Sequence, residues 1–109
     1  VKFMTDCIFC KIISRDIPSY QIYEDDDVFV FNDINPKAEV HLLIIPKLHI
    51  ESMLQLTEDH LSLMGKIMVL ANKLALEHGL HGGYKTQINT GIKGGQEVFH
   101  LHVHLVGNR

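Results

Sequence analysis

Three histidines near the C-terminal end of the chain are separated by single aliphatic residues, in the order His100, Leu101, His102, Val103 and His104. Side chains of a β-strand alternate between its two faces, so this spacing predicts a strand with three imidazoles on one face. Imidazole binds metals, attacks electrophiles and carries protons near neutral pH. Two kinds of chemistry therefore fit the pattern. It is part of a zinc site, or it supports a covalent reaction in which one imidazole attacks phosphorus.

A glycine-rich segment at residues 91–95 lies just before these histidines. Glycine lets the main chain come close to a ligand, and the N–H groups of such a loop can hold an anion. Gln96 adds a neutral amide to the segment. The loop and the histidines together favour a phosphate site beside a nucleophile over a metal site.

The rest of the sequence predicts the elements that must position these groups. Strands are predicted at residues 20–24, 28–31, 39–45, 84–90 and 99–106, with an acidic turn at residues 25–27. Apolar residues spaced three and four apart predict a long helix from a cap at Thr57 to a glycine stop at Gly79. A short helix capped by Asp6 precedes the first strand. This order predicts an α+β domain with a mainly antiparallel, five-stranded sheet and the long helix on one face.

The composition is that of one ordinary globular domain spanning residues 1–109. A net charge of −3 gives no basic stripe for nucleic acid, and no apolar run approaches the roughly 20 residues that span a membrane. The two cysteines are too few for a secreted disulfide scaffold, and no signal-peptide pattern is present. We therefore expect a cytoplasmic protein, with residues 1–5 disordered or foreign to the natural chain.

The histidine strand and its preceding loop resemble the signature of the histidine triad (HIT) superfamily, His-φ-His-φ-His-φ-φ. The resemblance covers nearly the whole chain, and segments at residues 8–13, 31–36 and 44–47 look like the Hint branch. It implies a HIT-like fold and a homodimer whose two sheets join into one ten-stranded sheet. It also implies hydrolysis of purine nucleoside 5′-phosphoramidates, with no metal required for catalysis.

The resemblance assigns a role to three histidines. His102 would attack the α-phosphorus, expel the amine and form a nucleotidyl-histidine intermediate that water then hydrolyses. His104 would contact the phosphate or its bridging atom, and His41 would join a hydrogen-bond relay behind the nucleophile. Without the family, His41 fits equally well as a core histidine bonded to a backbone carbonyl.

The resemblance also implies a nucleotide site. Asp33 would bind the ribose hydroxyls, although a carboxylate at this point in a loop is also a common turn cap. Residues around the purine would be Phe9, Ile12, Phe31 and Ile34, all of which would otherwise be assigned to the core. Asn89 would hold the phosphate side, with Gly95, Gln96 and Glu97 completing the nucleotide-binding loop.

Cys7 and Cys10 form a C-x-x-C pair. We do not expect a thioredoxin-like motif, because the six residues before Cys7 are too few for the strand of a βαβ unit. Several HIT proteins bind zinc through such a pair and two histidines, and the matching positions here are His49 and His100. A structural Cys₂His₂ zinc site and a pair of plain buried thiols both stay open.

Two departures from the Hint pattern put substrate preference in question. Glu97 stands where animal members have serine, and a carboxylate beside a phosphate repels it unless turned away or protonated. It could instead receive the leaving ammonium, and it suggests a prokaryotic source. The chain also stops at Arg109, where Hint proteins often carry a further tail.

Other functions also fit this sequence. A nucleotide-binding interaction module with little turnover would use the same pocket. A zinc-dependent hydrolase would use the histidine strand as metal ligands, and a dinucleoside polyphosphate hydrolase would be a near alternative within the superfamily.

Overall fold

Five antiparallel strands form one sheet in the computed structural model, which describes residues 7–109. The strands are β1 (Gln21–Glu24), β2 (Val28–Asn32), β3 (Val40–Pro46), β4 (Lys85–Gln87) and β5 (Val103–Gly107). Their order across the sheet is β1-β2-β3-β5-β4, and every neighbouring pair is antiparallel. The predicted α+β fold with a five-stranded antiparallel sheet is therefore confirmed.

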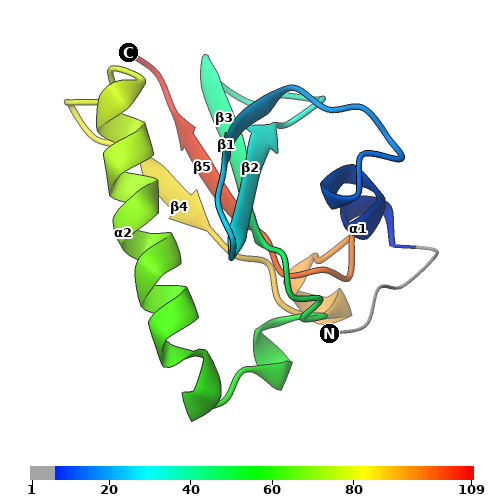
Figure 1. Ribbon diagram of the computed structural model, residues 1–109. Helices are drawn as coiled ribbons and strands as arrows, with labels where there is room; N and C mark the ends of the chain where they lie inside the picture. The colour runs from blue at the N-terminus through cyan, green and yellow to red at the C-terminus, as the bar shows by residue number, and fades with distance from the viewer. Residues whose placement is uncertain (1–6) are drawn as a thin grey trace.

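The two faces of the sheet carry different helices (Figure 1). Val28 and Val30 of β2 belong to a core shared with the long helix α2 (Leu61–Glu77). Phe29 and Phe31 of the same strand belong to a second core, built with the short helix α1 (Ile8–Ile13). The strict alternation along β2 separates the two cores and leaves the α1 face for the site described below.

The ends of α2 follow the predicted signals. Thr57 caps a short 3₁₀ helix, η2 (Glu58–His60), which runs directly into α2. At the other end Gly79 has a φ of +85°, and the N–H of Leu80 donates to the carbonyl of Ala75. This is a Schellman-type stop, in which a left-handed glycine satisfies the last carbonyls. At the start of α1, Cys7 is the N-cap, and the cap predicted at Asp6 lies outside the described residues, as do residues 1–5.

The histidine strand is shorter than predicted. β5 begins at Val103, so His100 and His102 precede it, and β4 spans only three residues. The register pairs Ile44 with Val103, which would place Leu101 opposite Pro46. Proline has no N–H, so the ladder ends there, and Leu101 N–H donates instead to the carbonyl of Ile50, at 2.6 Å.

Short 3₁₀ turns complete the fold at η1 (Met53–Gln55) and η3 (Ile92–Gly94). The predicted acidic turn is confirmed, because one carboxylate oxygen of Asp25 accepts from the N–H groups of Asp27 and Val28. Among the described residues, α2 and the shorter helices do not combine the length and apolarity that crossing a membrane requires.

Candidate active site

A pocket of about 890 Å³ opens on the α1 face of the sheet. The pocket lining draws on α1, the loop after β2, strands β3 and β4, and the segment leading into β5. Of the residues predicted to bind nucleotide or act in catalysis, it brings together Phe9, Ile12, Phe31, Asp33, Ile34, His41, Asn89, Gly95, Glu97, His102 and His104. Gln96 is the exception, because its side chain is buried behind the loop.

His102 lies in this pocket with one ring nitrogen already engaged. Its Nδ1 is 2.7 Å from the carbonyl oxygen of His100, which can only accept, so Nδ1 carries the proton. A neutral imidazole then has its lone pair on Nε2. Burial lowers the pKa of His102, which favours this neutral form near pH 7. The ring is therefore held in the tautomer that a nucleophile needs.

His104 is set in the opposite tautomer by His41. The N–H of Lys37 donates to His41 Nδ1 at 3.0 Å, so the proton of a neutral His41 is on Nε2. That Nε2 lies 2.9 Å from His104 Nδ1 and donates to it, which leaves the proton of His104 on its own Nε2. Burial lowers the pKa of both His41 and His104 and keeps this chain of single protons intact near pH 7.

The relay thus differs in detail from the sequence expectation. His41 contacts His104, whereas the group behind His102 is a main-chain carbonyl. The rings of His102 and His104 are adjacent, with centroids 5.0 Å apart. His102 can present a lone pair, and His104 an N–H, to the same part of a ligand. Phosphoryl chemistry uses such a pair of nucleophile and acid.

Asp33 caps the turn after β2, and its carboxylate faces His41. One of its carboxylate oxygens accepts from the N–H of Asn35 at 2.8 Å, as the turn-cap interpretation predicts. The other lies 3.3 Å from His41 Nε2. The carboxylate is therefore at the pocket wall with capacity for further donors, since each oxygen can accept more than one hydrogen bond.

Aromatic and aliphatic side chains line the part of the pocket nearest α1. Phe9 and Phe31 pack edge to face with centroids 5.5 Å apart, and Ile12 is buried with them. Ile34, in contrast, is 90% exposed. Three of the four residues predicted to surround the purine therefore belong to the core as well as to the pocket. Ile34, the fourth, projects toward solvent at the pocket.

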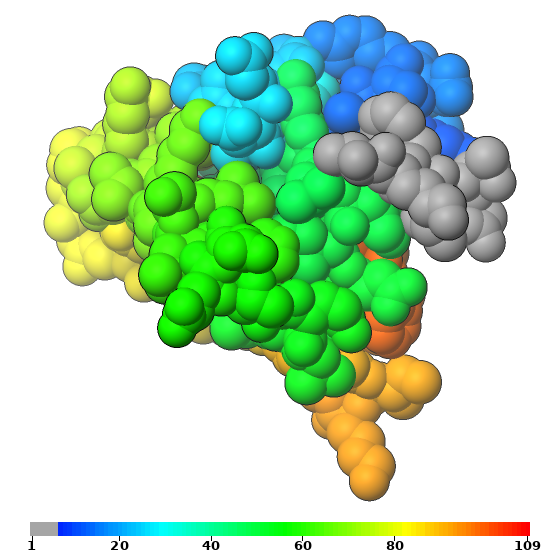
Figure 2. Space-filling view, turned by 60° about the horizontal axis from the view of Figure 1, so that its bottom comes forward, coloured from blue at the N-terminus to red at the C-terminus, as the bar shows by residue number. Residues whose placement is uncertain are grey.

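The glycine-rich loop is stabilised largely by its own hydrogen bonds. The N–H groups of Gly94, Gly95 and Gln96 all donate to carbonyls of Gly91 or Ile92, so they are already used within the loop. Gly95 has a φ of +84°, a conformation that favours glycine. Figure 2 shows this orange segment projecting from the body of the molecule.

Gln96 braces the loop from behind. It is 5% exposed, and its amide oxygen accepts from the N–H of Gly91. Its amide nitrogen donates to the carbonyls of Glu51 and Val98. A buried amide must satisfy all of its polar atoms, so this side chain is committed to holding the loop.

Asn89 and Glu97 lie on the pocket side of the loop. Asn89 donates to the carbonyl of Gly95 at 3.3 Å and accepts from Gln87 at 2.8 Å. Sequence reasoning missed Gln87 and Lys85, which line the same wall. Alternation along β4 was the available signal, because residues 85, 87 and 89 share one face of an extended segment. The main-chain donor of Lys37 left no signal in the sequence.

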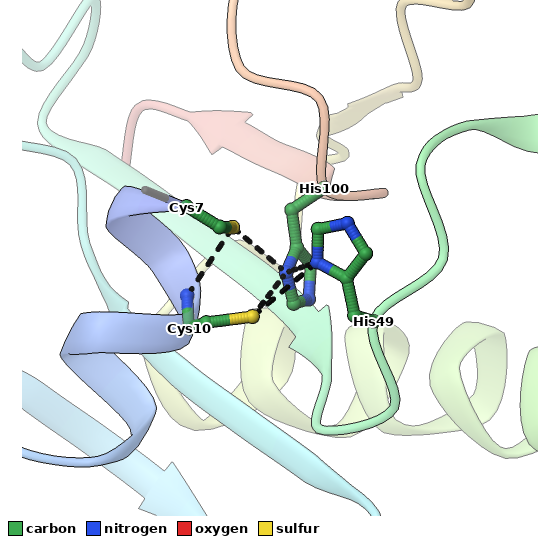
Figure 3. Close-up of side chains that lie close together, drawn as sticks. All are labelled: Cys7, Cys10, His49 and His100. Carbon is green, nitrogen blue, oxygen red and sulfur yellow. Dashed lines mark hydrogen bonds between the residues drawn. The ribbon is translucent and has the colours of Figure 1, made fainter. Parts of the chain in front are cut away.

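Four metal-ligating side chains converge beside the pocket (Figure 3). Cys7 and Cys10 come from the start of α1, His49 from the loop after β3, and His100 from the segment before β5. His100 Nδ1 lies 3.4 Å from Cys7 Sγ, 3.6 Å from Cys10 Sγ and 3.2 Å from His49 Nδ1. His49 Nδ1 is 3.3 Å from Cys10 Sγ.

These separations fit a tetrahedral ion. In a tetrahedron, bond lengths of about 2.0–2.1 Å to nitrogen and about 2.3 Å to sulfur put two nitrogens about 3.3 Å apart, and a nitrogen and a sulfur about 3.6 Å apart. His100 Nε2 donates to the carbonyl of Pro46 at 2.8 Å, which leaves Nδ1 as the ligand atom. Burial lowers the pKa of His100 to about 4, so the ring stays neutral. The four residues therefore fit a closed, structural zinc site, which is separate from the ring nitrogens of His102 and His104.

Comparison with known proteins agrees with this fold. The family model described as "Scavenger mRNA decapping enzyme C-term binding" matches residues 6–109. Protein HitA of Neisseria gonorrhoeae is 50% identical over 104 residues, covering 95% of this chain and 97% of that protein. A 14 kDa zinc-binding protein of Brassica juncea is 43% identical over 106 residues, covering 95% and 94%.

A solved structure gives the same result. The crystal structure of a HIT family hydrolase from Legionella pneumophila Philadelphia 1 superposes with a TM-score of 0.93 at 44% identity, covering 95% of this chain and 94% of that one. The chain belongs to the histidine triad superfamily, as the spacing of its histidines predicts.

Proposed function

We propose that this protein is a purine nucleoside 5′-phosphoramidate hydrolase of the Hint branch, acting through a nucleotidyl-His102 intermediate. The observation that carries the proposal is the fixed tautomer of His102: Nδ1–H donates to the carbonyl of His100 and Nε2 is left as the lone-pair nitrogen in the pocket. The similarity to the HIT family hydrolase from Legionella pneumophila supports the general class of reaction.

In the first step, His102 Nε2 forms a bond to the α-phosphorus while the P–N bond breaks. The leaving nitrogen must take up a proton to depart as a neutral amine. A neutral imidazole cannot give up its only proton near pH 7, so this step requires one proton from solvent on the His41–His104 pair, which His104 Nε2–H then passes to the leaving nitrogen. His41 keeps that proton on the correct nitrogen of His104. In the second step, water attacks the phosphorus and loses a proton to the relay, and the bond to His102 Nε2 breaks to release the nucleotide.

The pocket provides for both halves of a nucleotide. Phe9, Phe31 and Ile34 offer apolar surface for a purine, and the Asp33 carboxylate can accept hydrogen bonds from a ribose diol. Asn89, Gly95 and Glu97 line the wall on the loop side. The apolar side chains at the α1 end of the pocket support a base there, with the phosphate between the histidines and the loop.

Zinc bound at the cluster would act as a structural crosslink between α1 and the segment that carries the histidines. We also propose a cytoplasmic location, because two cysteines are too few for a secreted disulfide scaffold. We also propose that residues 1–109 form a single HIT domain.

The proposal includes a homodimer formed through α2 and β4. β4 is at the edge of the sheet, and its three residues are all exposed. The outer face of α2 exposes Leu61, Val69 and Leu76, of which Val69 is 73% exposed. An exposed strand edge beside an apolar helix face supports pairing with a second copy, which would extend the two sheets into one.

The decisive experiment is turnover of a purine nucleoside phosphoramidate by wild type and His102→Ala, with His81→Ala as a surface-histidine control. We expect release of amine by wild type and the control, and none by His102→Ala. Rapid quenching and peptide mass spectrometry should find a nucleotidyl adduct on the peptide containing His102. Nucleotide binding without turnover in wild type would support an interaction module instead and reject the hydrolase.

A further inference from the structure

The main chain at His102 lies outside the sheet, whereas that at His104 is part of β5. β5 begins at Val103, so no strand pairing fixes the main chain at His102. Leu101 N–H donates to the carbonyl of Ile50 in a neighbouring loop. Further fixation of this stretch comes from the side chain of His100, which is fully buried.

His100 connects the metal cluster with His102. Its ring faces Cys7, Cys10 and His49 through Nδ1 (Figure 3). Its main-chain carbonyl accepts the hydrogen bond from His102 Nδ1. A metal ion that fixes the His100 ring therefore also fixes the carbonyl that selects the tautomer of His102.

Phe9 forms a second connection between the two sites. It lies in α1 between the two cysteines, and its ring packs edge to face against His102, with centroids 5.1 Å apart and planes at 86°. The same ring packs against His100, at 6.0 Å. Coordination of Cys7 and Cys10 would hold the helical turn that carries Phe9, and with it one side of the His102 ring.

We propose that metal binding at Cys7, Cys10, His49 and His100 positions His102, so that His100 is a positioning residue as well as a ligand. The effect of the metal on turnover rests on the proposed function, whereas its effect on the orientation of the His102 ring does not. With metal bound, His102 is a single Nδ1–H tautomer. Without it, the His100 carbonyl moves and His102 becomes a mixture of tautomers. His104 takes its tautomer from His41 and is unaffected, so it is an internal reference.

Two substitutions of one ligand test this proposal. His49 belongs to the metal cluster, where it contacts Cys10 and His100. Among the described residues, it forms no hydrogen bond or ring stacking with His102. His49→Ala removes a ligand, whereas His49→Cys replaces it and forms a Cys₃His set, which is also a structural zinc site. Metal content and circular dichroism establish occupancy and folding for each variant.

The principal readout is ¹⁵N NMR of the imidazole nitrogens, which distinguishes the two tautomers of each ring. We expect zinc-loaded wild type and His49→Cys to show His102 as Nδ1–H, and His49→Ala to show a mixture while His104 stays Nε2–H. For phosphoramidate turnover we expect kcat of His49→Ala to fall by about tenfold or more, because small displacements of a reacting group are costly. KM should change by less than about threefold, since the binding surfaces are kept.

A folded, zinc-free His49→Ala that keeps the Nδ1–H tautomer of His102 and the wild-type kcat would overturn the proposal. If that variant does not fold, zinc is titrated into chelator-treated wild type and the same signals are followed. The His102 tautomer should then change with occupancy while His104 does not. Collapse of both signals together would show that metal only folds the protein, and would also overturn it. Absence of phosphoramidate turnover in wild type would reject the proposed function, and the NMR comparison would still decide the positioning role.

Discussion

The contributions of the two hydrogen bonds of His41 can be separated by a matched pair of substitutions. His41→Gln places an amide N–H near the position of Nε2, so it can still donate to His104 Nδ1. His41→Asn places its amide near Nδ1, so it can still accept from Lys37 N–H but no longer reaches His104. The distances being replaced are 2.9 Å to His104 and 3.0 Å from Lys37.

The size of the effect follows from the bond that is lost. A neutral hydrogen bond contributes about 0.5–1.5 kcal/mol net. Without the donor, His104 can also place its proton on Nδ1, the wrong nitrogen for protonating the leaving amine. A loss of about 1.4 kcal/mol corresponds to about tenfold in rate. We therefore expect His41→Asn to lower kcat about tenfold, and His41→Gln to lower it by much less.

The assay is steady-state phosphoramidate hydrolysis, with nucleoside monophosphate affinity measured in parallel. Affinity should be similar in both variants, because the loss concerns proton placement and not the purine or ribose contacts. Equal kcat for the two variants would refute the reasoning, since it would mean that the His41–His104 bond does not determine which nitrogen of His104 carries the proton.

Four further outcomes are expected. Burial lowers the pKa of His102, whose Nε2 must be unprotonated to attack, so the acid limb of the kcat/KM profile for phosphoramidate hydrolysis should lie below pH 6.5; a limb above 6.5 would contradict this. Burial would raise the pKa of Asp25, but hydrogen bonds from Asp27, Lys66, Tyr23 and Val28 lower it from 3.8 to about 2. The Asp25 carboxylate thus contributes about 2 kcal/mol to the free energy of unfolding above pH 4, and this contribution is lost as pH falls toward 2. In denaturant unfolding, Asp25→Asn should therefore be less stable than wild type by about this amount at pH 7 but not near pH 2. Gly95→Ala should cost about 1 kcal/mol of unfolding free energy because of its positive φ, whereas Gly94→Ala, with open space at its Cβ, should cost less. Val69→Glu should shift the protein from dimer to monomer in light scattering, and a wild type that is already monomeric would reject the α2 and β4 interface.

Much of the fold follows from local patterns. The apolar run from Val28 to Phe31 predicts a strand, and such a strand forms, with all four of these residues buried. The cap at Thr57 and the stop at Gly79 bracket the long helix as predicted. Local patterns did not predict where the last strand begins, because that depends on Pro46, a residue of another strand, and on its missing N–H.

The site divides in the same way. The sequence by itself determined which groups are available: three alternating histidines, a cysteine pair and a glycine-rich loop. Only the tertiary structure decided which nitrogen of each ring is free, because a tautomer depends on the partner of the other nitrogen, and those partners are the His100 carbonyl, the Lys37 N–H and the His41 ring. It also turned the Gln96 amide into the loop and brought His49 to the cysteines, since hydrogen bonds and ligand contacts between distant segments have no periodicity in the sequence.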